Sequence, residues 1–125
     1  MPTFPNATYL MPAVLLWGDS YRVDARLRLE AAPGHTPGSS VLKLTSGGEH
    51  ALFAADLLHT PLQLGRPDHS SCFCEDPAQA RVTRRRLLGW AVGHSALVLP
   101  AHFSGAGAFE VTERGDSFAV RRWVP

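Results

Sequence analysis

The sequence predicts an α/β layered domain in which strands outnumber helices. Residues 21–32 alternate between apolar and polar side chains, which is typical of a strand with one buried face. Residues 51–58 are almost entirely apolar and predict a strand covered on both faces. Asp76 followed by Pro77 is a typical helix start, and apolar residues at helical spacing extend from there to about residue 92.

The remaining strands follow from shorter patterns. Apolar runs bounded by turn residues predict strands at 7–14, which Pro12 interrupts, at 40–45 and at 96–102. Residues 109–124 predict a terminal hairpin that turns at 114–116.

The helix has two chemically different sides. The apolar side, which we expect to pack on the sheet, consists of Ala80, Leu87, Leu88 and Ala91. The other side, which we expect to be solvated, consists of Arg81, Arg84, Arg85 and Arg86.

Composition excludes several classes of protein. The 125 residues are 45% hydrophobic, enough for one domain with a core. The chain has 12 Lys and Arg residues and 11 Asp and Glu residues, and this balance of charge argues against a nucleic-acid partner. No apolar run is long enough to span a membrane, and the first residues do not form a secretory signal. Cys72 and Cys74, one residue apart, predict no disulfide, so we expect a cytoplasmic protein.

Three potential metal ligands stand where apolar strands end. His35 lies in the turn PGHTPG, Asp56 near the end of the 51–58 strand, and His102 in LVLPAH. If these strands are neighbours, the three side chains converge on one rim of the sheet. Two imidazoles and a carboxylate are suitable ligands for Zn²⁺.

Each residue also has an ordinary structural interpretation. His35 and His102 could be turn residues, and Asp56 could cap a turn or pair with an arginine. A carboxylate among apolar neighbours needs a hydrogen-bonding or cationic partner in any case. A separate metal or redox site at Cys72 and Cys74 with His69 is a weaker hypothesis, because Cys-x-Cys with one nearby histidine is a weak signal.

Three segments together carry a family resemblance. PGHTPGSS, ALFAADLLHTPLQL and LVLPAHF occur in this order, and they resemble the C-terminal half of the metallo-β-lactamase-fold hydrolases, in the branch of lactonases and organophosphate hydrolases. The resemblance extends from about Thr3 to His102. It implies an αββα sandwich of which this chain, residues 1–125, forms one partial domain.

The resemblance also implies roles for individual residues. His35 would bind the first metal, Asp56 would bridge two metals, and His102 would bind the second, with Zn²⁺ as the expected ion. His59 would orient Asp56 or contact a small-molecule substrate. Ser39 replaces a frequent second histidine of the GHTPGH motif and would act behind the ligands. The implied reaction is the opening of an ester, lactone or phosphoester by a metal-bound hydroxide.

The departures from the family pattern limit this expectation. The motif His-x-His-x-Asp-His, which supplies the other ligands and the acid-base aspartate, is absent, so no catalytic residue is assigned. We therefore expect an incomplete metal site. We also expect an uncovered inner sheet face that includes Leu27, Leu29 and Phe53, with a second copy or a complementing N-terminal half as partner. The alternative is an inactive half-domain that folds or oligomerises without chemistry.

Overall fold

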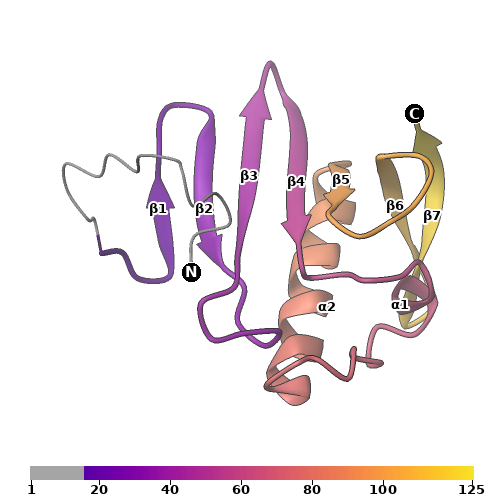
Figure 1. The fold of residues 1–125 in the computed structure, drawn as a ribbon. Coiled ribbons are helices and arrows are strands. Elements are labelled where there is room, and N and C mark those ends of the chain that lie inside the picture. The colour runs from indigo at the N-terminus through magenta and orange to yellow at the C-terminus, as the bar shows by residue number, and fades with distance from the viewer. Residues whose placement is uncertain (1–15) are drawn as a thin grey trace, which may run out of the picture.

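The computed structural model describes residues 16–125, so the strand predicted at 7–14 lies outside the described residues. Within this range the chain forms a mixed sheet of seven strands with two helices (Figure 1). The elements are β1 (Ser20–Arg22), β2 (Leu27–Ala31), β3 (Ser40–Ser46), β4 (Glu49–Ala55), α1 (Leu62–Gly65), α2 (Pro77–Gly93), β5 (Leu97–Pro100), β6 (Ala108–Arg114) and β7 (Ser117–Val124).

The strands lie side by side in chain order. Every neighbouring pair is antiparallel except β4 and β5, which are parallel. A parallel pair needs a long crossover connection, and residues 56–96 with both helices supply it. The predicted α/β class, with strands in the majority, is confirmed.

The core lies between α2 and one face of the sheet. The sheet contributes Leu52, Val98 and Phe109, and the helix contributes Leu87 and Leu88, all of them fully buried. The helix begins as predicted, because the Asp76 carboxylate accepts a hydrogen bond of 2.9 Å from the Gln79 backbone nitrogen. No helix within residues 16–125 is long and apolar enough to span a membrane.

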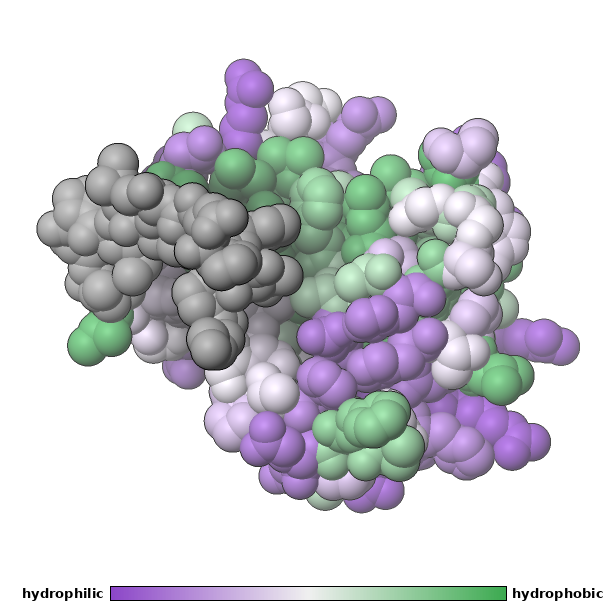
Figure 2. All heavy atoms as spheres, in the orientation of Figure 1, coloured by the Kyte–Doolittle hydropathy of each residue, from purple (hydrophilic) through white to green (hydrophobic). Residues whose placement is uncertain are grey.

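The opposite face of the sheet carries apolar side chains without a covering layer of described residues. The strand register places Leu29, Leu42, Phe53 and Leu99 in one row across β2 to β5. The Phe53 side chain is 39% exposed. Figure 1 shows α2 behind the sheet, and Figure 2, in the same orientation, shows hydrophobic residues gathered on the face turned toward the viewer. The expected uncovered face is therefore confirmed for Phe53, whereas Leu27 and Leu29 are half-buried. The two-sided burial predicted for 51–58 is wrong.

The predicted single strand at 21–32 is also wrong. It is a hairpin of β1 and β2, and Val23 and Ala25, expected on the buried face, are exposed. The Asp24 carboxylate accepts hydrogen bonds from the backbone nitrogens of Arg26 and Leu27, and these bonds close the turn.

Arg84 is the clearest error in the predicted solvated side of α2. Its side chain is 1% exposed and donates hydrogen bonds to the backbone carbonyls of Leu57, Pro67 and His69, at 3.1, 2.6 and 3.0 Å. Burial lowers the pKa of this guanidinium. Arg84 thus holds the crossover segment that follows Asp56 against the helix.

Candidate metal centre

The loop with PGHTPG is held against the start of α2 by backbone contacts. The backbone nitrogens of Glu75 and Asp76 donate to the carbonyls of His35 and Gly34, at 3.0 and 2.9 Å. Gly34 has a φ of +133°, and a β-carbon there would lie 2.3 Å from the Ala80 backbone. The glycine is required for this close approach, which fixes the position of His35 beside the helix.

Ser39 acts inside this loop. Its hydroxyl accepts a hydrogen bond from the Thr36 backbone nitrogen at 3.1 Å and lies 2.9 Å from the Thr36 hydroxyl. Ser39 therefore closes the turn that carries His35, which agrees with a role behind the ligands rather than as one of them.

Asp56 is placed at the rim by the end of β4. It is the first residue after the strand, and its side chain is 42% exposed rather than buried. His102 Nε2 donates a hydrogen bond to Asp56 Oδ1, and His35 Nε2 lies 4.0 Å from Asp56 Oδ2. The hydrogen bond from His102 is the main reason that the pKa of Asp56 lies below its ordinary value.

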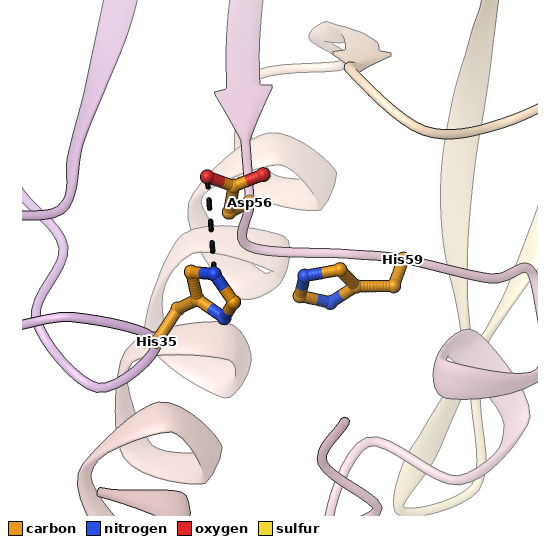
Figure 3. Close-up of side chains that lie close together, drawn as sticks. All are labelled: His35, Asp56 and His59. Carbon is orange, nitrogen blue, oxygen red and sulfur yellow. Dashed lines mark ion pairs between the residues drawn. The ribbon is translucent and has the colours of Figure 1, made fainter. Parts of the chain in front are cut away.

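His59 completes the group from the crossover segment. A ligand atom of His59 lies within 4.8 Å of ligand atoms of His35 and Asp56, and Figure 3 shows the three side chains pointing toward one another. The His59 ring is stacked on His102 with centroids 5.3 Å apart. Of the three ligands inferred from sequence, His35 and His102 each lie next to Asp56. The group whose ligand atoms all lie within 4.8 Å of one another contains His59 in place of His102.

His59 is oriented through its backbone. Gln63, which is buried, accepts a hydrogen bond of 2.7 Å from the His59 backbone nitrogen and donates one of 3.0 Å to the His69 carbonyl. Arg84 binds that same carbonyl, so the two side chains hold the segment from both ends. Sequence analysis did not assign Gln63 or Arg84 to the site, since neither follows a ligand motif.

The donor set fits a divalent metal ion. The His59 Nδ1 atom is buried and has no hydrogen-bond partner among the described residues, a costly state that a bound cation would relieve. Burial, assisted by the charges of His35 and His102, lowers the pKa of His59 and favours the neutral ring that metals bind. Imidazole nitrogens and one carboxylate are the ligands that Zn²⁺ takes.

Cys74 contributes to the site in a way that the sequence did not indicate. Its sulfur lies 3.6 Å from His35 Nδ1, on the side of the ring opposite to Asp56. Cys72 is exposed instead. Among residues 16–125, the ligand atoms of Cys72, Cys74 and His69 do not form a metal-binding group, so the hypothesis of a cysteine-based metal site is wrong in this part of the chain. A redox role of the two free cysteines stays a prediction.

Comparison with known proteins places this arrangement in a known fold. No family model and no curated protein matches the chain. Among solved structures, the dizinc quorum-quenching lactonase AidC aligns over 87% of this chain and 36% of its own, with a TM-score of 0.75 and 24% identity. The chain has the metallo-β-lactamase fold.

Two further solved structures with the metallo-β-lactamase fold are also similar to this chain. The hydrolase AbOPH of the β-lactamase superfamily aligns over 78% of this chain and 34% of its own, with a TM-score of 0.71 and 22% identity. A probable metal-dependent hydrolase from Staphylococcus aureus aligns over 89% of this chain and 41% of its own, with a TM-score of 0.72 and 17% identity. The chain thus spans well under half the length of each of these proteins.

Proposed function

We propose that this chain carries part of the metal centre of a zinc-dependent hydrolase that acts on an ester, a lactone or a phosphoester. The observation that supports this most directly is the convergence of His35, Asp56 and His59 within 4.8 Å, with His102 hydrogen-bonded to Asp56. The solved structures with this fold include a dizinc lactonase and a hydrolase, which is the reason for the proposed reaction class.

Each of the four side chains would have its own role in binding metal ions. Asp56 offers one carboxylate oxygen toward His102 and the other toward His35, an arrangement that suits a carboxylate shared by two ions. His35 and His102 would then each serve one ion, and His59 would add a nitrogen close to His35. A bound Zn²⁺ supplies Lewis acidity, which lowers the pKa of water and polarises a carbonyl or phosphoryl oxygen.

The site is incomplete in this sequence. None of its six histidines, at 35, 50, 59, 69, 94 and 102, forms the His-x-His-x-Asp-His motif. Full activity would need further ligands from a complementing N-terminal half, because an ion without a fixed ligand set does not activate water efficiently.

The test is hydrolysis by purified chain loaded with Zn²⁺, assayed on an acyl-homoserine lactone and on an aryl phosphotriester. The proposal expects turnover that is weak for the chain alone, rises when a complementing half is added, and is abolished by Asp56→Asn. Turnover that is identical in wild type and Asp56→Asn would contradict it, since the contaminating or uncatalysed reaction would then explain the signal.

A half-domain that self-associates without chemistry is the second candidate. The observation that favours it is the apolar row of Leu29, Leu42, Phe53 and Leu99, which carries no charge that would oppose packing against the same face of a second copy. Sedimentation would show a dimer that Leu42→Lys dissociates. A monomer at all accessible concentrations would contradict this candidate.

A further inference from the structure

A second pair of histidines lies at the opposite end of β4 from the candidate metal centre. His50 is the second residue of β4, and His94 is the C-terminal cap of α2. Asp56 lies six positions after His50, which corresponds to about 20 Å at the usual rise of a strand. The two histidines are therefore independent of the site already described.

The Nδ1 atom of each of the two imidazole rings already has a hydrogen-bond partner. His94 Nδ1 lies 2.9 Å from the Trp90 carbonyl oxygen, and because a carbonyl can only accept, Nδ1 carries the proton. The lone pair of neutral His94 is then on Nε2. His50 Nδ1 lies 3.0 Å from the Thr45 hydroxyl. Histidines that bind metals typically engage their second nitrogen in this way, with a carbonyl or hydroxyl that orients the ring.

The separation of the rings suits one shared ion. Their centroids are 4.9 Å apart, and the ring planes are inclined by 73°. Two imidazoles that bind one ion at about 2.0 Å, with an angle between roughly 90° and 110° at the metal, have centroids roughly 4.5–5.2 Å apart. The observed separation lies inside this range.

The surroundings limit which ion can bind. The hollow beside the two histidines is also lined by the cationic Arg22, Arg26, Arg28 and Lys43 and by the acidic Asp24 and Glu30, of which Lys43 and Glu30 form an ion pair. Ca²⁺ and Mg²⁺ require oxygen ligands, so they do not suit this site. Cu²⁺ binds imidazole most strongly among the common divalent ions of the first row, and the negative end of the α2 dipole lies beside His94.

We propose that His50 and His94 form a second metal site, which takes Cu²⁺ in preference to other divalent ions through the two Nε2 atoms, with water or a small anion in the remaining positions. This site goes beyond the proposed hydrolase centre and does not depend on it.

Trp90 provides a reporter for this site. Its indole is stacked on His94 with centroids 4.6 Å apart and lies 6.0 Å from His50. Bound Cu²⁺ at this distance quenches indole fluorescence. The experiment is titration of chelator-treated protein with CuCl₂, followed by tryptophan emission and, independently, by equilibrium dialysis.

The expected result is saturable quenching that weakens at least ~10-fold in affinity for His50→Ala and for His94→Ala, the loss typical of a removed ligand contact. His69→Ala, an exposed histidine elsewhere, and Asp56→Asn should leave the quenching unchanged. Trp90→Phe should abolish the fluorescence change, while dialysis still finds the bound copper. Equal copper affinity in wild type, His50→Ala and His94→Ala would overturn the proposal.

Discussion

His102 Nε2 and Asp56 Oδ1 form a direct hydrogen bond although 46 residues separate them in the chain. The parallel pairing of β4 with β5 makes this contact possible, because the ends of both strands then lie at the same rim of the sheet. The crossover that joins the two strands also brings His59 to the rim. The site is thus a consequence of the sheet topology.

His59 should behave as a ligand rather than as a substrate contact alone. His59→Ala is expected to lower Zn²⁺ affinity at least ~10-fold, because it removes a nitrogen that lies within 4.8 Å of the other ligand atoms. The measurement is competition with a zinc-sensitive dye. The matched control is His69→Ala, ten residues along the same crossover. An unchanged affinity in His59→Ala would restrict His59 to a role outside the ligand set.

Arg84 should be a major contributor to stability. Arg84→Met leaves the carbonyl oxygens of Leu57 and Pro67 without this donor in a buried site, so the free energy of unfolding should fall by about 3 kcal/mol. The His69 carbonyl keeps its hydrogen bond from Gln63. Arg81 is exposed on the same helix, and Arg81→Met should change stability by less than about 0.5 kcal/mol. Urea denaturation compares the two. Equal, small effects would show that Arg84 is not needed to hold the crossover.

Gly34 should tolerate no side chain. Gly34→Ala combines a positive φ with a contact of 2.3 Å to the Ala80 backbone, and we expect a loss of about 3 kcal/mol. Gly38 lies in the same loop with open space around it, so Gly38→Ala should be nearly neutral. Thermal unfolding of both variants measures the difference. Similar melting temperatures would contradict the close approach of this loop to α2.

Glu30 should make stability depend on pH in acid. Burial, the largest effect, raises its pKa, but hydrogen bonds from Lys43 and Arg86 outweigh it, so the pKa in the folded protein lies below the ordinary value of 4.5. The stabilisation is therefore present above pH 4.5 and is lost as pH falls through the lower, folded pKa. Glu30→Gln should cost about 1 kcal/mol at pH 7 and progressively less below about pH 4. Urea unfolding of wild type and Glu30→Gln at pH 7 and below pH 4 tests this. A stability difference between the two proteins that is as large in acid as at pH 7 would refute it.

The sequence predicts those elements whose signals are local. The start of α2 at Asp76 and Pro77 and the terminal hairpin each depend on a few adjacent residues, and both are confirmed. The split of 21–32 was not predictable from alternation, because the pattern continues through the turn. The bonds from Asp24 to two backbone nitrogens decide the turn instead.

In the candidate metal centre, too, the residues marked by local patterns were predictable, and those that depend on tertiary contacts were not. The sequence indicates three of the site residues, because each lies close to the end of a strand: His35, Asp56 and His102. This pattern can be recognised without knowing how the strands are arranged. His59 as a neighbour of His35, and Arg84 as a buried donor, depend on how residues 57–69 pass over the helix. An arginine at a helical position otherwise indicates a solvated side, so the sequence alone could not place it in the interior.

The most direct test of the metal centre is zinc content by elemental analysis after equilibrium dialysis, compared between wild type, Asp56→Asn and the control Asp68→Asn. Asp68 is an exposed carboxylate paired with Arg85 and lies outside the site. We expect bound zinc in wild type and in Asp68→Asn and a marked loss of zinc in Asp56→Asn. The same zinc content in all three proteins would contradict it.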